Sequence, residues 1–404
     1  MRGTVPVSRY TSPKFQLARI IREGRHKLEA EYQITAHQKG VLTSMTGCRT
    51  ESMGGHVAEC PKCGEVHYIF RSCRNRHCNI CGGMKREQWV NDRKKDMLPV
   101  KYLHIVFTLP HLLNRLVLNN QQPLFDLLMR SAWQTLKQFG DDHRHLGAKV
   151  GAVMVLHTWG QNLSYHSHVH CLVPAGGLTK QGKWRNVRGK GKFFAPVKQM
   201  SKVFRGKFTD GLIKLHNKGS IQLEVPFDEK RKYLHPMYKT KWVVYAKKPM
   251  PTGEKVIEYI GRYVHRVAIS NSRIKNYDGK TVTFSWFSYK TSKPTQTPLD
   301  VVSFLHRFVL HILPKGFAKI RHYGILASKN KTAAIKTIRE QLGAPQPEVP
   351  EKPGWRETYE AIYGQNPMLC KKCKEGILVI IATIPSSRDG PKYDPTAGLT
   401  PQYF

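Results

Sequence analysis

The chain of 404 residues is poor in acidic side chains, with 28 Asp and Glu against 66 Lys and Arg, so its formal net charge is +38. This scarcity argues against an active site built from several carboxylates. The excess of positive charge favours a polyanionic partner, most simply nucleic acid. An anionic membrane surface would also match the charge if charge is considered alone.

Long apolar runs are also absent. No stretch approaches the about 18 consecutive apolar residues of a membrane-spanning helix. The first residues, MRGTVPVSRYTSPKF, lack the apolar core of a secretion signal. We therefore expect a cytoplasmic protein without a membrane partner. The sequence contains no internal repeat and implies no particular oligomeric state.

Apolar periodicity predicts an α+β core. Segments rich in β-branched and aromatic residues alternate with amphipathic segments whose apolar residues recur every three or four positions. The order is strand, helix, strand, strand, helix, strand, at residues 100–110, 123–139, 148–159, 165–174, 196–216 and 239–248. This order is that of the ferredoxin-like, or RRM-like, antiparallel sheet. In that sheet the first and third strands form the inner pair.

The segments that flank this core also have recognisable patterns. Residues 14–45 and residues 253–268 are predicted to be helical, because apolar side chains recur at three-to-four spacing. Residues 344–354 are rich in proline and predict a linker.

Nine cysteines, most of them in C-x-x-C pairs, argue against a disulfide framework in the cytoplasm. Cys60 and Cys63 precede Cys78 and Cys81 at a spacing typical of zinc sites, in which each pair supplies two thiolates of a tetrahedron. Four protein ligands leave no open position for water, so this zinc would be structural. Neighbouring residues can replace one ligand or form a second site: Cys48, His56, His67, Cys73 and His77.

The loop RSCRNRHC within this region is basic. Arg74 and Arg76 are therefore candidates for phosphate contacts, and a solvated basic surface is the alternative. A third pair, Cys370 and Cys373, has no further pair after it. A zinc ion there would need ligands from elsewhere in the chain.

Three histidines, His166, His168 and His170, occupy alternate positions of the strand predicted at 165–174. Alternate side chains of a strand project from one face, so the three rings are expected to lie together. Neutral imidazole is a common metal ligand. A metal site at the centre of the sheet is therefore one interpretation, and a strand edge with satisfied hydrogen bonds is the other.

Tyr259 and Tyr263 are four residues apart in a predicted helix and therefore share one helical face. An aromatic core stripe would explain such a pair by itself. In a chain suited to nucleic acid, with a histidine metal site nearby, the pair also suggests a covalent nucleophile toward a phosphodiester. A divalent cation, Mg²⁺ or Mn²⁺, would polarise the phosphate.

Several motifs resemble those of rolling-circle enzymes. His168-Val169-His170 resembles the His-hydrophobic-His (HUH) signature of rolling-circle nucleases, and Phe107-Thr108-Leu109 is similar to the first motif of rolling-circle replication initiators. Over about residues 40–327 the chain resembles transposases of the IS91 family of insertion sequences. The motifs are CRTESMGGHVAECPKCG, SCRNRHCNIC, VFTLP, LHTWGQNLSYHSHVHCLVP, WVVYAKKP, YIGRYVHRVAISNSRI and LPKGFAKIRHYGILA.

This resemblance implies a DNA transposase that cleaves single-stranded DNA at insertion-sequence ends and joins it to target DNA, at the bacterial nucleoid. Family members carry two tyrosines on one helix, and Tyr259 and Tyr263 match both positions. One tyrosine would form a 5′-phosphotyrosine and release a 3′ hydroxyl, and the other would serve a second strand exchange.

The resemblance also implies that His168 and His170 hold the catalytic Mg²⁺ or Mn²⁺ together with a third ligand from a neighbouring strand. We expect His157, placed opposite His166 on the preceding strand, to be that ligand. Gln161 is the reserve candidate, and His166 is left as structural or substrate-contacting.

Further DNA contacts are predicted at three places. Basic and aromatic residues mix at 180–194, as single-strand binders require, although a solvated loop is the alternative. Two lysines end the last core strand. The segment ISNSRI follows the tyrosines, where its polar residues would bind DNA or hold the helix. The candidates are Lys183, Trp184, Arg185, Lys247, Lys248, Asn271 and Arg273.

The expected organisation has four parts: a helical segment (1–45), a zinc-binding domain (46–95), the HUH nuclease domain (98–327) and a basic C-terminal region with the CxxC tail (328–404). A plasmid replication initiator or relaxase would use the same chemistry. A zinc-dependent DNA-binding protein without catalysis, and a transposase that uses three carboxylates, are the remaining alternatives.

Overall fold

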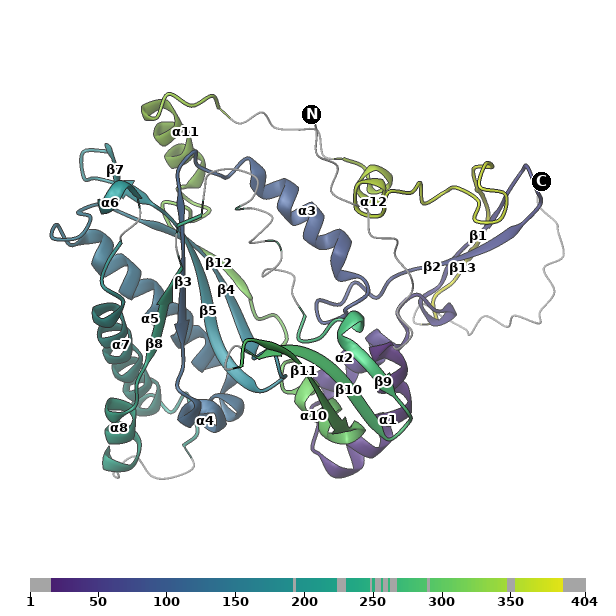
Figure 1. The fold of residues 1–404 in the computed structure, drawn as a ribbon, viewed down its shortest axis with the longest axis horizontal. Helices are drawn as coiled ribbons and strands as arrows, with labels where there is room; N and C mark the ends of the chain where they lie inside the picture. The colour runs from purple at the N-terminus through teal and green to yellow at the C-terminus, as the bar shows by residue number, and fades with distance from the viewer. Residues whose placement is uncertain are drawn as a thin grey trace.

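A computed structural model describes residues 16–191, 194–223, 230–247, 249–250, 256, 261, 267–288, 291–346 and 353–387. Its centre is a five-stranded sheet in the order β12-β4-β5-β3-β8, and each neighbouring pair is antiparallel (Figure 1). The strands are β3 (Tyr102–Thr108), β4 (Gly151–Trp159), β5 (Tyr165–Pro174), β8 (Val243–Ala246) and β12 (Ile320–Gly324). As the sequence predicts, β3 and β5 lie side by side inside the sheet.

Two long helices, α5 (Gln121–Asp141) and α7 (Val197–Asn217), cover one face of this sheet (Figure 1). Apolar residues at helical spacing, such as Leu124, Leu128 and Leu136, give α5 a buried face. They pack against alternate residues of the strands, including Val169 of β5. The alternation leaves the intervening histidines of β5 on the opposite face. Two short helices, α4 (Asn114–Asn119) and α8 (Lys230–Lys239), lie beside these.

The opposite face of the sheet is covered by different segments. Val155 of β4 and Leu172 of β5 form a buried cluster with Val256 and with Ile335 and Ile338 of α11 (Lys331–Gln341). The strand β12, which the sequence analysis does not predict, extends this face by pairing with β4.

A second body of the protein forms where residues 17–46 pack against residues 268–312. It contains α1 (Leu17–Glu31) and α2 (Ala36–Thr46), the sheet β9 (Ile274–Tyr277), β10 (Thr281–Ser288) and β11 (Lys293–Asp300), and α10 (Val301–Val309). Gly24 lets α1 approach α10, because a Cβ there would lie 2.8 Å from Leu305 and from Val301. The predicted helical region is thus two helices, and a capping box at Thr35 and Gln38 starts the second one.

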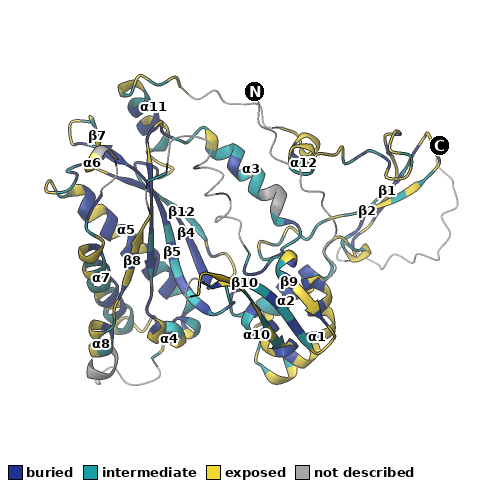
Figure 2. Ribbon diagram, in the orientation of Figure 1, coloured by how far each residue is buried: buried dark blue, intermediate teal, exposed yellow. Residues whose placement is uncertain are grey.

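A third body joins the two ends of the described chain. The sheet has the order β13-β1-β2, with β1 (Gly55–Glu59), β2 (Val66–Phe70) and β13 (Val379–Ile384). In Figure 1 this sheet projects away from the central one, and Figure 2 shows that β13 is largely exposed. The helices α3 (Gly82–Lys94) and α12 (Trp355–Tyr363) contact each other between the bodies.

The remaining elements are short. They are the hairpin of β6 (Gly176–Leu178) and β7 (Trp184–Asn186), α6 (Arg188–Gly191), and the 3-10 turns at Glu51–Met53, His111–Leu113 and Asn271–Arg273. Among the helices that the structure describes, none has the length and apolarity to cross a membrane.

Candidate functional site

Three imidazoles meet on the face of β4 and β5 that points away from α5 and α7. His168 and His170 extend from β5 and His157 from β4, and one ligand nitrogen from each lies within 4.8 Å of the others. The ring centroid of His157 is 5.5 Å from that of His168 and 4.6 Å from that of His170. His157 is buried and the other two are half-buried. Three neutral donors on rigid strands can hold one divalent cation and leave further coordination positions for a substrate.

The pairing of β4 with β5 differs from the expected register. His157 lies opposite His168, not opposite His166, and an irregularity after His157 brings Trp159 opposite Tyr165. The slip amounts to two residues of β5, which is one full strand period. Because a two-residue slip keeps every side chain on its face, the three histidines still converge.

In both His168 and His170, the Nδ1 atom has a hydrogen-bond partner. His168 Nδ1–H donates to the carbonyl oxygen of His166 at 2.7 Å. His170 Nδ1 lies 2.8 Å from Nε2 of His104, and the two rings are stacked at 5.0 Å. When both Nδ1 atoms carry the proton, both Nε2 lone pairs are available to a cation, which is the usual arrangement of metal-bound histidine.

His104 of β3 is a residue that the sequence analysis missed. It is 4% exposed, and burial, with a smaller effect of Lys247, lowers its pKa to about 4. It is therefore neutral at pH 7 and able to accept a hydrogen bond from His170. The β3–β5 register places His104 opposite Leu172, diagonal to His170. The one sequence signal for this role was a single histidine within the largely apolar strand sequence VKYLHIVFTLP.

Gln161 and His166 lie outside the histidine group. The side-chain oxygen of Gln161 accepts from the backbone N–H of Phe287 at 3.0 Å, so this residue is turned toward β10. His166 lies beside His111, with ring centroids 5.1 Å apart. The structure thus brings His157, and not Gln161, to His168 and His170.

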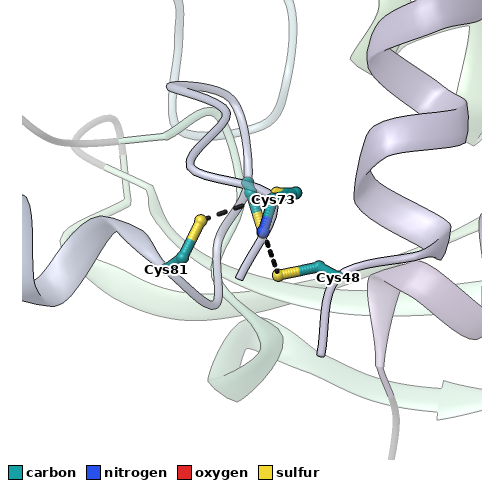
Figure 3. A group of neighbouring side chains, drawn as sticks. Cys48, Cys73 and Cys81 are labelled. Atoms are coloured by element: carbon teal, nitrogen blue, oxygen red, sulfur yellow. Dashed lines mark hydrogen bonds between the residues drawn. The ribbon is translucent and has the colours of Figure 1, made fainter. Parts of the chain in front are cut away.

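One group of four thiols lies where α2, the loop after β2 and the start of α3 meet. It contains Cys48, Cys73, Cys78 and Cys81, whose sulfur atoms lie within 4.8 Å of one another. The Sγ atoms of Cys73 and Cys81 are 3.6 Å apart, and the backbone N–H of Cys73 donates to Cys48 Sγ at 3.4 Å (Figure 3). Hydrogen bonds from Cys73, Cys78 and Cys81 lower the pKa of the Cys48 thiol.

A second group of four thiols lies at the far end of the β13-β1-β2 sheet. Cys60 and Cys63 follow β1, and they meet Cys370 and Cys373. The Sγ atoms of Cys60 and Cys373, and those of Cys63 and Cys370, are 3.7 Å apart in each case.

The expected set of Cys60, Cys63, Cys78 and Cys81 is therefore not the set that the fold assembles. The hairpin of β1 and β2 carries the first pair away from the second, and each pair finds two other thiols. Of the five neighbouring residues that could replace a ligand or form a second site, Cys48 and Cys73 lie with Cys78 and Cys81. All nine cysteines are free of disulfide bonds.

His56, His67 and His77, the other zinc-ligand candidates, belong to neither group of four thiols. His67 Nε2 lies 3.4 Å from Cys370 Sγ, and His56 Nδ1 lies 3.4 Å from the hydroxyl of Thr383. His77 lines a cavity with Arg76 and Lys319, and burial lowers its pKa to about 3.

The predicted DNA contacts divide into exposed residues and residues that hold the fold. Arg74 and Lys183 are exposed. Arg76 donates to the carbonyl oxygens of Pro314 and Phe317. Trp184 packs over Gly176, and its ring N–H donates to Asn186 at 2.9 Å.

The other candidates are divided in the same way. Arg185, although exposed, donates to the carbonyl oxygen of Leu146 at 3.2 Å. Lys247 is exposed, and its backbone N–H donates to the carbonyl oxygen of His104 at 3.0 Å. Lys248 lies outside the described residues.

Asn271 and Arg273 tie three segments together. The buried side-chain oxygen of Asn271 accepts from the backbone N–H of Leu17 at 2.9 Å and from Asn79 at 2.6 Å. Arg273 donates to the carbonyl oxygens of Ser285 and Gln161. These contacts hold neighbouring segments together, which is neither of the two roles expected for ISNSRI.

Tyr259 and Tyr263 lie outside the described residues, but two residues near them are described. Val256 is fully buried in the cluster on the histidine side of the sheet, together with Val155 and Leu172. Gly261 lies against α3, because a Cβ there would be 2.5 Å from a methyl group of Val90.

Two protein families match parts of this chain. Residues 20–109 match the family described as transposase zinc-binding domain, and residues 151–333 match the family described as "putative transposase". All four cysteines of the first thiol group lie inside the former range, and the three histidines lie inside the latter. Cys370 and Cys373 lie outside both ranges.

Whole-chain comparisons give the same assignment. The chain is 37% identical to "Putative transposase y4qJ" of Sinorhizobium fredii, over 91% of this chain and 94% of that protein. It is 29% identical to the transposase for insertion sequence element IS801 of Pseudomonas savastanoi pv. phaseolicola, over 82% of this chain and 80% of that protein. The solved structure of the conjugative relaxase TrwC in complex with oriT DNA aligns with 41% of this chain and covers 71% of its own chain. The identity is 12% and the TM-score is 0.24. The chain therefore belongs to the IS91 family of insertion-sequence transposases and carries the transposase zinc-binding domain of that family.

Proposed function

We propose that this transposase cleaves and rejoins single-stranded DNA at the ends of its insertion sequence by tyrosine attack, in rolling-circle transposition. The observation that carries the proposal is the convergence of His157, His168 and His170 within 4.8 Å. The strand order β4-β5-β3-β8 supports a ferredoxin-like HUH nuclease core, since it is the order in which the first and third strands of that pattern are the inner pair.

The three histidines would hold Mg²⁺ or Mn²⁺, which when bound polarises the scissile phosphate and neutralises charge that develops on its oxygens. The protein fixes the ligand geometry through β4 and β5 and through the outer hydrogen bonds to His104 and to the His166 carbonyl. Exposed Lys247 adds positive charge near His104.

The nucleophile would be the phenolic oxygen of Tyr259 or Tyr263. As this oxygen bonds to phosphorus, the bond from phosphorus to the 3′ oxygen breaks, the phenol loses its proton and the 3′ oxygen gains one. The product is a 5′-phosphotyrosine and a free 3′ hydroxyl, so the phosphoester bond is conserved for later rejoining. Two neighbours of the tyrosines in sequence support this role. Val256 lies in the buried cluster on the histidine side of the sheet, and Gly261 lies against α3, whose Trp89 packs against that cluster.

The four thiols of Cys48, Cys73, Cys78 and Cys81 would hold a structural zinc ion. Four sulfur donors that converge within 4.8 Å satisfy the ligand number and type of a closed zinc site. The net charge of +38 supplies affinity for DNA phosphates that does not depend on base sequence.

The test is an adduct assay with single-stranded oligonucleotides from the element ends and Mn²⁺, in which covalent protein–DNA product is separated on denaturing gels and the linked peptide is mapped. We expect the double variant Tyr259→Phe, Tyr263→Phe to form no adduct while it still binds DNA. The matched control is the double variant Tyr359→Phe, Tyr363→Phe on α12, another pair four residues apart, with ring centroids 4.4 Å from each other. An adduct on the first double variant would refute tyrosine attack, and normal folding without any adduct in the unmodified protein would favour a non-catalytic DNA-binding protein.

A further inference from the structure

We propose that Cys60, Cys63, Cys370 and Cys373 form a second tetrathiolate zinc site, which clasps the C-terminal segment to the zinc-binding domain. Two of these ligands lie outside both family-matched ranges. The clasp would thus join residues more than 300 positions apart in the chain.

The spacing of the sulfur atoms is the first support. Zinc–sulfur bonds of about 2.3 Å in a tetrahedron set the sulfur atoms about 3.8 Å apart. The measured distances of 3.7 Å, for Cys60 with Cys373 and for Cys63 with Cys370, agree with that edge length. All four sulfur atoms lie within 4.8 Å of one another, as one shared ion requires.

The backbone at the two pairs is the second support. After each pair the chain makes the same tight turn: Gly64 N–H donates to the carbonyl of Cys60 at 2.8 Å, and Lys374 N–H donates to that of Cys370 at 3.0 Å. Both turn residues have left-handed backbones, with φ of 67° and 60°. This conformation is unfavourable for lysine, so it indicates a turn that the surroundings impose.

The contacts of the sulfur atoms agree with bound thiolates. Gly376 N–H donates to Cys373 Sγ at 3.3 Å, and His67 Nε2 lies 3.4 Å from Cys370 Sγ. A Cβ at Gly376 would lie only 2.3 Å from Cys60 Sγ, so glycine is required for the two turns to approach. Two ion pairs also cross between the turns, Lys372 with Glu65 and Lys62 with Glu375.

The apolar core beside Cys60 and Cys370 is small, and its size is a further reason to expect a metal ion. Its buried cluster contains five residues, Ala58, Cys60, Met368, Cys370 and Leu378, and two of the five are the cysteines themselves. A core of this size does not hold a three-stranded sheet without a metal or disulfide. Zinc binding would supply that free energy and would keep β13 paired with β1.

The experiment counts zinc ions per chain by native mass spectrometry and elemental analysis of the full-length protein. All variants carry His168→Ala and His170→Ala, so that the histidine site contributes no zinc. We expect two zinc ions in this background, one after Cys373→Ser, one after Cys81→Ser, and two after Cys171→Ser, which alters a buried thiol of β5 outside both groups.

Double variants separate this clasp from the pairing that sequence spacing favours. If the clasp exists, Cys60→Ser with Cys373→Ser leaves one zinc ion, whereas Cys60→Ser with Cys81→Ser leaves none. If Cys60, Cys63, Cys78 and Cys81 share one ion, Cys373→Ser retains the full zinc content, and the proposal is overturned.

A milder variant guards against loss of folding. Gly376→Ala keeps all thiols but places a methyl group against Cys60, so we expect a chelator to remove one of the two zinc ions at least tenfold faster than from the background protein. An unchanged release rate for both ions would contradict the proposed approach of the two turns. The zinc count does not depend on DNA cleavage, so its failure and the failure of the proposed tyrosine chemistry are distinguishable.

Discussion

The central sheet and the terminal sheet of this transposase place metal-ligand residues in opposite settings. On the face opposite the three histidines, the core between the central sheet and α5 and α7 contains 39 buried residues among those described. The cluster beneath the second thiol group contains five such residues. Because the central sheet has a large apolar core of its own, a metal at the three histidines would serve the proposed cleavage and not the folding of the sheet. The terminal sheet offers four donors and no open position, which suits a structural ion.

The largest effect that this comparison predicts is at the histidines. His168→Ala with His170→Ala should lower single-strand cleavage by on the order of 10³-fold, because the lost cation stabilises the transition state by several kcal/mol. Thermal unfolding of the central domain should change little, since these side chains lie outside the large core. Single-turnover cleavage and calorimetry measure the two effects, and collapse of the fold would show that the histidines are structural.

The next effect concerns the residue behind the ligands. His104→Ala removes the hydrogen-bond partner of His170 and should weaken Mn²⁺ affinity by about 10–100-fold, as loss of such partners does at other metal sites. Raising the Mn²⁺ concentration should restore much of the cleavage rate. His26→Ala, at an exposed position of α1, is the control. A defect that added Mn²⁺ cannot correct would point to a packing role for His104.

A smaller effect is expected where α3 meets the tyrosine-bearing segment. Gly261→Ala places a methyl group 2.5 Å from Val90, and the displacement should slow adduct formation by about tenfold, as misplacement of a reacting group does. Val90→Ala makes room for this methyl group and should restore most of the rate in the double variant. Equal rates in the single and double variants would mean that this contact does not position the tyrosines.

The smallest effect is predicted at the ion pairs of the clasp. Lys372→Ala removes an exposed pair with Glu65, and exposed pairs contribute little to stability. The zinc content and the melting temperature should therefore stay within experimental error of the unmodified protein. If zinc is lost from this variant, charge and not thiolate coordination holds the two turns together.

Local patterns predicted much of the central sheet and of its site. Period two in β5 fixed the common face of His168 and His170, and the hairpin brought His157 to them even though its register differs by two residues. Helical spacing located α5 and α7, and the inner position of β3 and β5 followed from the order of the elements. These features depend on residues close in the chain or on one well-defined sheet pattern.

Other features lay beyond any local pattern. The partner of Cys60 and Cys63 is a pair about 300 residues later, and nothing in the spacing of the first four cysteines distinguishes it from the nearer pair. His104 gained its role only through the register of β3 against β5. Asn271 was expected to bind DNA or hold the tyrosine helix, whereas its side-chain oxygen accepts hydrogen bonds from Leu17 and Asn79.

By itself, the sequence determined the charge that suits DNA, the shared face of the histidines and the pair of tyrosines. It also supplied enough cysteines for two zinc sites with four thiolates each. The tertiary structure decided which thiols meet, because a hairpin can carry one C-x-x-C pair away from its neighbour and a returning C-terminal strand can supply another. It also decided which polar side chains contact the histidines, as His104 does, and which form hydrogen bonds between distant segments, as Asn271 does. Ligand type is a property of residues, whereas ligand sets are a property of the fold, since chain segments far apart become neighbours only when their strands pair.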